Sequence, residues 1–187
     1  MSERRRIPVR GAMIAALALA VLAWAAWRLL RAPEPPAALT AASPDSSSAG
    51  FRAVTLYFAA PGGDSLVAEP RDLIEAAGLH ERVASLVAEL DRGPRSGGVA
   101  ALPAGTSVLH VYLDDRGLMT LDLSGAFQQG FRGGSRAEYL AVASLVRTLG
   151  DNLPEVRRVL LCCGGRPLAT LGGHLPLDRP LETADWP

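Results

Sequence analysis

A run of 17 uncharged residues, Gly11–Trp27, restricts which part of this chain can build a globular core. A helix over this run would extend roughly 25 Å, close to the ~30 Å hydrocarbon core of a bilayer. Four arginines precede the run, at positions 4, 5, 6 and 10, and arginines of this kind favour the cytoplasmic side. The pattern predicts a cytoplasmic basic tail (1–10) and a single transmembrane anchor (11–30). We therefore expect an inner (cytoplasmic) membrane protein whose remaining chain is extracytoplasmic, or periplasmic.

A cleaved signal peptide is the alternative interpretation of the same segment. Ala23-Trp24-Ala25 places small residues at the spacing that a signal peptidase recognises. The apolar run is longer than a usual signal-peptide core, and Trp27 and Arg28 follow the site directly. These features favour an uncleaved signal-anchor, although cleavage stays open at this point.

The charge balance supports this division of the chain. The whole sequence has 19 arginines and lysines against 19 acids, a formal net charge of +0. Residues 1–31 contain six arginines and one acid, whereas residues 32–187 contain 13 arginines and 18 acids. An acidic folded part argues against binding to nucleic acid, which proteins bind through basic surfaces.

A spacer separates the expected anchor from the expected domain. Residues 31–50 contain four prolines, and the triplet Ser46–Ser48 precedes Gly50. Proline blocks regular structure and serine keeps a linker solvated. We interpret 31–50 as a Pro/Ser-rich linker and 51–187 as one domain.

The first half of the domain alternates between strand and helix patterns. Ala53–Ala59 alternates apolar and polar residues as a strand does, and Leu66–Arg71 is a second expected strand. An amphipathic helix follows, with apolar residues at 79, 83, 86 and 90, and Gly93-Pro94 ends it. Val108–Leu113 and Leu118–Leu123 flank the turn residues Asp114–Gly117, which predicts a hairpin.

The second half repeats this alternation. Ser135 and Glu138 have the spacing of a capping box at the start of a second helix, and Gly150 is the expected C-cap. The expected buried stripe of this helix is Tyr139, Val142, Ala143, Val146 and Leu149. Val159–Cys163 and Pro167–Leu171 then form a closing hairpin around Gly164-Gly165. The order β-β-α-β-β-α-β-β predicts an α+β fold, with two principal helices on one face of a mainly antiparallel sheet.

A search for catalytic residues finds no recognisable constellation. Ser124 does not lie in a G-x-S-x-G motif and is more simply an N-cap for the turn to Phe127. The three histidines, His80, His110 and His174, lack the spacing of a zinc site. We interpret His110 as a hydrogen-bonded structural residue of a strand. The carboxylates of Asp114-Asp115 and of Glu89 and Asp91 are expected to be solvated.

The remaining notable residues also have structural interpretations. Cys162 and Cys163 are neighbours on a strand and point to opposite faces, so they cannot bind one metal together; two small apolar side chains are the default, and a vicinal disulfide stays open. Gly133-Gly134 precedes a helix and fits either a turn or an anion site. The sequence therefore predicts no catalytic, cofactor-binding or metal-binding residues and no cofactor.

A series of short motifs runs in order from about Val54 to Leu181. They are Leu56–Phe58; Leu66 with Glu69 and Arg71; Glu89-Leu90 before Gly93-Pro94; Leu102–Thr106; Leu121–Ser124 with Phe127; Gly134-Ser135 with Glu138; Leu145–Leu149; and Gly164-Gly165. Together they resemble the GerMN domain of bacterial envelope proteins, a family associated with sporulation and spore germination. This chain departs from the family pattern in having one copy of the domain and no lipobox cysteine.

The resemblance implies a small α+β domain held at the outer face of a membrane, with a role in assembly or in peptidoglycan-related envelope processes. It implies no catalytic residues, and Tyr57, Arg71, Pro94 and Ser124 are better explained by folding. We expect a membrane-anchored, non-enzymatic binding or assembly module with an unidentified envelope protein or peptidoglycan as partner. The alternatives are an envelope hydrolase or small-ligand-binding enzyme using Ser124, His110 and nearby carboxylates, and a homo-oligomer formed through exposed sheet edges.

Overall fold

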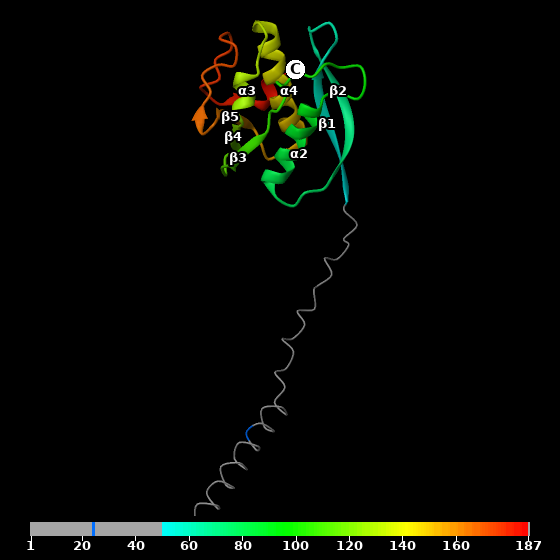
Figure 1. Cartoon of the computed structure of the whole chain (residues 1–187), viewed down its shortest axis with the longest axis vertical. Coiled ribbons are helices and arrows are strands. Elements are labelled where there is room, and N and C mark those ends of the chain that lie inside the picture. The colour runs from blue at the N-terminus through cyan, green and yellow to red at the C-terminus, as the bar shows by residue number, and fades with distance from the viewer. Residues whose placement is uncertain (1–23, 25–49, 187) are drawn as a thin grey trace, which may run out of the picture. The chain divides into compact units, whose positions relative to one another are not determined.

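The structure is a computed structural model that describes Trp24 and residues 50–186 (Figure 1). Contacts divide the chain into two units, residues 1–48 and 49–187. The predicted basic tail, anchor and most of the linker lie outside the described residues. Among the helices that are described, none has the length and apolar character to cross a membrane.

The domain begins with a long two-stranded ribbon. Strands β1 (Phe51–Ala59) and β2 (Leu66–Ile74) pair antiparallel over nine residues each. Alternate residues of β1 face the core, and Leu56 and Phe58 are fully buried. The prediction of two strands is confirmed, and β2 continues three residues beyond its predicted end at Arg71.

Five strands form a second sheet. β3 (Val108–Leu113) and β4 (Leu118–Leu123) form the predicted antiparallel hairpin, and β4 also pairs with β5 (Arg158–Cys163). This second pairing is parallel, because a helix carries the chain back along the sheet between β4 and β5. Two short strands, β6 (Arg166–Pro167) and β7 (Leu181–Glu182), pair antiparallel with β5.

The helices pack against both sheets. α2 (Leu79–Arg92) contacts β1 and β3, and α4 (Ser135–Asn152) contacts β1. In Figure 1, α2 and α4 lie between the β1–β2 ribbon and the five-stranded sheet. The α+β class and the mainly antiparallel pairing are confirmed. The strands divide into two sheets, however, rather than forming one sheet with both helices on a single face.

The two sheets are separate because α4 occupies the edge of β1 where another strand would pair. The side-chain amide of Asn152 bonds both backbone groups of Thr55, and the Thr148 hydroxyl accepts from the Tyr57 N–H at 3.1 Å. Ser144 donates to the Tyr57 carbonyl. These three α4 residues are four positions apart and therefore lie on one face of the helix. They satisfy backbone groups that would otherwise be buried without partners.

The predicted ends of α4 are wrong. Its N-cap is Gly134, without a side-chain hydrogen bond, and Ser135 is already helical. Glu138 does not complete a capping box, because its carboxylate is bonded by a distant loop. The helix also continues past Gly150 to Asn152, and Gly150 allows Thr183 to approach, since a Cβ there would lie 2.8 Å from the Thr183 Cβ.

The predicted buried stripe of α4 is correct except at Tyr139. Val142, Ala143, Val146 and Leu149 are fully buried as expected, whereas Tyr139 is 38% exposed. Tyr139 instead packs beside Trp186, with ring centroids 5.2 Å apart. This contact belongs to a C-terminal segment containing the 3-10 helix η1 (Thr183–Asp185), which contacts α4.

The closing hairpin is shorter than predicted. Gly164 and Gly165 make the turn with φ angles of 60° and 79°, a left-handed conformation that favours glycine. Only Arg166–Pro167 pairs with β5, and the chain then leaves the sheet edge. Leu168 and Leu177 are buried in the core at the start and end of the following loop.

Candidate functional site

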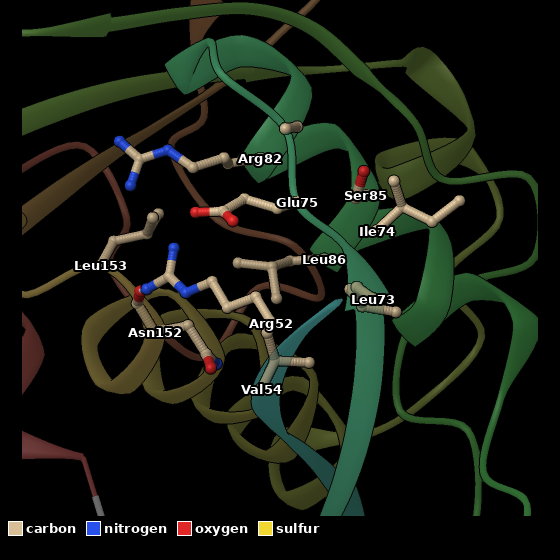
Figure 2. A pocket seen from close by; sticks show the side chains of 11 residues that line it. Arg52, Val54, Leu73, Ile74, Glu75, Arg82, Ser85, Leu86, Asn152 and Leu153 are labelled. Carbon is tan, nitrogen blue, oxygen red and sulfur yellow. The ribbon is translucent and has the colours of Figure 1, made fainter. Parts of the chain in front are cut away.

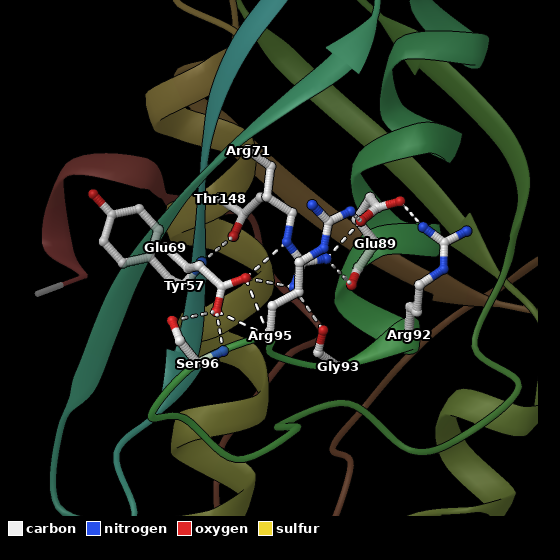
Figure 3. A network of polar contacts seen from close by, with 9 residues as sticks. All are labelled: Tyr57, Glu69, Arg71, Glu89, Arg92, Gly93, Arg95, Ser96 and Thr148. Carbon is white, nitrogen blue, oxygen red and sulfur yellow. Dashed lines mark hydrogen bonds and ion pairs between the residues drawn. The ribbon is translucent and has the colours of Figure 1, made fainter.

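A buried ionic network joins β2 to the end of α2 (Figure 3). The guanidinium of Arg71 contacts Glu69 at 2.6 Å and Glu89 at 2.5 Å, and it also donates to the carbonyl of Gly93 at 2.7 Å. Its side chain is only 1% exposed and lies 5.2 Å from the centroid of the Phe58 ring. α2 ends at Arg92 and its C-cap Gly93 has a φ of 89°, so that the carbonyls of Glu89 and Gly93 are directed at this cation.

The same network fixes the loop after α2. The carboxylate of Glu69 accepts from the backbone N–H groups of Arg95 and Ser96 at 3.0 and 3.1 Å. Burial opposes the ionisation of Glu69, but hydrogen bonds from Arg71, Ser96 and Arg95 hold its pKa below the usual value. The exposed side chains of Arg92 and Arg95 add ion pairs to Glu89. The arrangement restrains a loop, and its buried charges are satisfied within the protein.

Glu138 is a second buried anchor. It is fully buried and accepts hydrogen bonds from the Thr170 hydroxyl at 2.6 Å and from the backbone of Leu171 and Gly172 at 2.9 and 2.8 Å. The backbone N–H of His174 is 2.9 Å from the same carboxylate, and the His174 ring is 3.0 Å away. Burial would raise the pKa of Glu138, yet these hydrogen bonds lower it to about 2. The carboxylate therefore holds the loop after β6 onto α4.

A small cavity lies beside the first residues of β1. Figure 2 shows Arg52, Glu75 and Arg82 extending in the same direction over its lining. Its volume is about 20 Å³, enough for roughly one water molecule. The Nε of Arg82 is buried without a hydrogen-bond partner among the described residues, while its Nη2 contacts Glu155 at 2.6 Å. The cavity has a place for a solvent molecule and is too small for an organic substrate.

Two larger recesses open on the surface. One of about 550 Å³ lies between the end of β1, Val99–Ala101 and the first turn of α4. The other, of about 600 Å³, lies between α2 and the chain entering β3. The first recess is lined mainly by alanine and glycine. The second combines Ala84, Ala88 and Gly105 with polar and charged residues, Asp91 and Arg92 among them.

The residues of the catalytic alternative, Ser124 and His110, are not brought together as a nucleophile and its base. The Ser124 hydroxyl accepts from the Ser107 N–H at 3.1 Å and donates to the Gly105 carbonyl at 3.2 Å. Ser124 is the N-cap of the short helix α3 (Gly125–Gln129), as expected, although its side chain makes no capping bond. His110 is exposed on β3 rather than hydrogen-bonded in a strand, and its cross-strand partner Asp122 accepts from the Gly165 N–H instead. The described residues therefore contain no base positioned to activate Ser124.

Both cysteines lie in β5. Cys162 is buried and Cys163 is half-buried, and both are free thiols. Burial and the nearby charge of Asp122 raise the pKa of Cys162. The described residues contain no cluster of three or more His, Cys, Asp or Glu side chains that could hold a metal ion.

The sequence prediction missed the burial of the carboxylates of Glu89 and Glu138. Glu89 is buried in the ionic network rather than solvated, and Asp91 accepts from the Thr106 N–H at 3.0 Å. A signal was present for Glu89, because it lies between Leu86 and Leu90 on the apolar side of the helix. Glu138 gave no such signal, since its partners lie more than 30 positions further along the chain.

Comparison with solved structures places this arrangement in a known fold. The tandem GerMN domains of the sporulation protein GerM from Bacillus subtilis align with a TM-score of 0.60 and 22% identity, over 73% of this chain and 48% of that chain. The first GerMN domain of the same protein aligns with a TM-score of 0.57 and 24% identity, over 70% of this chain and 97% of that one. A putative lipoprotein from Clostridium perfringens aligns with a TM-score of 0.51 and 18% identity, over 73% of this chain and 90% of that one.

These structural likenesses establish the fold, and the chain spans about half of the tandem-domain structure. A search of curated proteins gives no match. The model of the Germane family, described as sporulation and spore germination, matches residues 55–169. This match runs from within β1 to β6 and includes Arg71 and Glu138, and it confirms the GerMN resemblance drawn from the motifs. The chain belongs to the Germane family and contains a GerMN-like domain.

Proposed function

We propose that this protein is a single-pass membrane protein whose GerMN-like domain lies outside the cytoplasm. In this proposal the domain binds an envelope partner, either protein or peptidoglycan, in an assembly process of the sporulation and germination type. The observation that supports a binding role over a catalytic one is that the buried carboxylates are bonded to other parts of the domain. The carboxylates of Glu69 and Glu138 hold loops in place, and the carboxylate of Glu89 pairs with Arg71.

The surface is consistent with binding. The recess of about 550 Å³ is lined mainly by small side chains, and the recess of about 600 Å³ adds polar and charged groups to its alanines. Sites of this kind recognise a partner by shape and hydrogen bonding, and their walls change little on binding. The hydrolase alternative requires Ser124 to meet a base, and the Ser124 hydroxyl is engaged with two backbone groups instead.

The proposed location rests on the sequence. The arginines at positions 4, 5, 6 and 10 precede the uncharged run, and the Pro/Ser-rich linker follows it. A relative of the same fold is described as a putative lipoprotein, which is a second way to hold such a domain at a membrane. This chain has cysteines only at 162 and 163, so a hydrophobic helix would replace the lipid.

Reporter fusions test the location directly. Alkaline phosphatase, active only outside the cytoplasm, is fused after residue 187 of the full chain in a bacterial host, and green fluorescent protein is fused there in parallel. We expect phosphatase activity and no fluorescence, together with membrane-bound protein whose N-terminal sequence is intact. A fluorescent C-terminal fusion without phosphatase activity would contradict the proposal, and a new N-terminus after Ala25 would show cleavage.

Cross-linking in intact envelopes tests the binding role. A photoreactive residue is placed in the recess at Ala137 of the full chain, and a control is placed at exposed Gln128 in α3. We expect a discrete adduct with one protein or with glycan strands from the recess position and none from the control. Repeated recovery of the uncoupled chain from both positions would count against a binding role at this recess.

A further inference from the structure

The outer edges of β1 and β2 are both closed to a further strand. On β1, Asn152, Thr148 and Ser144 of α4 occupy the backbone groups of Thr55 and Tyr57. On β2, Pro70 lies opposite Thr55, whose backbone groups face away from β2. The nitrogen of Pro70 therefore also faces outward, where a proline has no hydrogen to offer. Natural edge strands are commonly protected in these ways.

The outer edge of β3 carries no such protection over its second half. The N–H of Asp114 donates to the carbonyl of Leu118 at 3.0 Å, and this bond fixes which residues of β3 face β4. By antiparallel alternation, Tyr112 also directs its backbone groups to β4, whereas Val111 and Leu113 direct theirs away. β3 is the last strand on its side of the sheet, and no described residue bonds these outward groups.

A groove lies between α2 and the chain that enters β3, at the start of the same strand. The recess of about 600 Å³ is lined by Ala84, Ala88 and Asp91 of α2 and by Gly105–Val108 leading into β3. Ala84, Ala88 and Asp91 follow one another by four and three positions, so they share a helix face. Their short side chains leave space beside the strand. Leu109, the next residue of β3, lies at a bulge and is 41% exposed.

We infer that an extended peptide segment of an envelope protein adds to the outer edge of β3 and lies in the groove against α2. Backbone groups of Val111 and Leu113 would supply the hydrogen bonds, and the alanine face of α2 would accept alternate side chains of the peptide. Strand addition of this kind takes its affinity from main-chain bonds and its specificity from alternate side-chain positions. This inference rests on the binding role proposed above and names the class of partner.

The charges around the groove define the peptide further. Arg92 lines the groove, is 63% exposed and pairs with Glu89 on one side of its guanidinium. Asp91 in the groove is already bonded to the Thr106 N–H. Asp114 and Asp115 follow the other end of β3. The complementary peptide therefore has small apolar residues facing α2, an acidic residue near Arg92 and a basic residue near Asp115.

Peptide display on the full chain in detergent micelles tests this inference. A random decapeptide library is selected against the wild-type protein, and the tightest peptide is measured with three variants. Val111→Pro removes an outward N–H without removing a bond to β4, and Ala88→Glu fills the groove from an exposed helix position. Ala68→Pro is the matched control, because Ala68 also directs its N–H outward, on the edge of β2.

We expect Val111→Pro and Ala88→Glu to weaken peptide binding about tenfold or more, and Ala68→Pro to leave it unchanged. Amide hydrogen exchange should slow at Val111 and Leu113 when the peptide binds. Equal binding by wild type and by both groove variants would overturn the inference, as would protection confined to β2. Self-association of the full chain that protects these amides without peptide would replace the partner with a second copy.

This experiment and the reporter fusions fail separately. The display experiment measures binding by the purified protein, whereas the fusions score the side of the membrane. Phosphatase-negative fusions together with a peptide bound at β3 would overturn the proposed location, and the inference that a peptide binds at β3 would stand. Phosphatase-positive fusions without peptide binding at β3 would overturn only the inference that a peptide binds there.

Discussion

The side-chain amide of Asn152 satisfies both backbone groups of Thr55, accepting from its N–H at 2.9 Å and donating to its carbonyl at 2.7 Å. Asn152 thus does for β1 what a neighbouring strand would do. Its second donor hydrogen reaches the Thr148 carbonyl of its own helix at 2.7 Å. The pair explains how the ribbon stays attached to α4 while remaining outside the larger sheet.

Replacing Asn152 with leucine should destabilise the domain by about 2–3 kcal/mol, because two backbone groups of Thr55 lose their partners. Urea denaturation followed by circular dichroism measures the change in unfolding free energy. Asn152→Asp, which keeps the acceptor and loses the donor, should show a loss as well. The control Gln128→Ala removes an exposed amide from α3 and should stay within about 0.5 kcal/mol of wild type. A neutral Asn152→Leu would contradict the role of this residue.

Much of the local structure could be predicted because it depends on neighbours in the sequence. Alternation located β1, β3 and β4, and the Asp114–Gly117 turn follows the expected chemistry, with the Asp114 carboxylate accepting from the Leu118 N–H at 2.8 Å. The division into two sheets could not be predicted, since it requires Asn152 to meet Thr55 across 97 positions. Likewise, the parallel pairing of β4 and β5 depends on the path of α4.

In the candidate site, too, local features could be predicted and long-range contacts could not. The sequence correctly suggested that Ser124 begins a turn and that both cysteines lie on one strand. It treated Glu138 as a capping residue because Ser135 stands three positions before it. The structure uses Glu138 at long range, and a short motif carries no information about a loop that arrives later in the chain. Sequence reasoning thus recovers the elements and misses the contacts that join them.

The buried Glu138 carboxylate should make the domain sensitive to acid. Its pKa is lowered to about 2 in the folded protein, whereas an unfolded glutamate titrates near pH 4.3. The stabilisation is therefore fully present above about pH 4.3 and is lost as the pH falls toward about 2, with a slope of at most about 1.4 kcal/mol per pH unit.

Urea midpoints measured between pH 2 and pH 6 test this. Glu138→Gln should be less stable at pH 6, because the amide cannot accept all the hydrogen bonds, and its stability should change less with pH. Glu81→Gln, at an exposed position of α2, should keep the wild-type profile. An unchanged pH profile in Glu138→Gln would show that another group controls the acid response.

Arg71 and Arg92 offer a matched comparison, because both contact the carboxylate of Glu89. Arg71 is 1% exposed and Arg92 is 63% exposed. Arg71→Met should cost about 3–5 kcal/mol, since it leaves two buried carboxylates without their cation. Arg92→Met should cost less than about 1 kcal/mol, as exposed ion pairs do. Denaturation gives both values, and faster amide exchange at Arg95 and Ser96 in Arg71→Met would locate the change in the loop. Equal costs for the two variants would exclude the network as a source of stability.

Gly150 provides a test in which helix propensity and packing oppose each other. Alanine would favour an exposed helix by about 1 kcal/mol over glycine, but its Cβ at position 150 would lie 2.8 Å from the Thr183 Cβ. Gly150→Ala should therefore displace η1 from α4 and expose the segment ending at Trp186 to protease. Gly134→Ala has no atom within 4 Å of the added Cβ and should leave proteolysis unchanged. The double variant Gly150→Ala/Thr183→Gly should recover protection of the C-terminal segment, because it removes the contacting atom. If protection is lost in Gly150→Ala and does not return in the double variant, contact with Thr183 is not the reason that position 150 requires glycine.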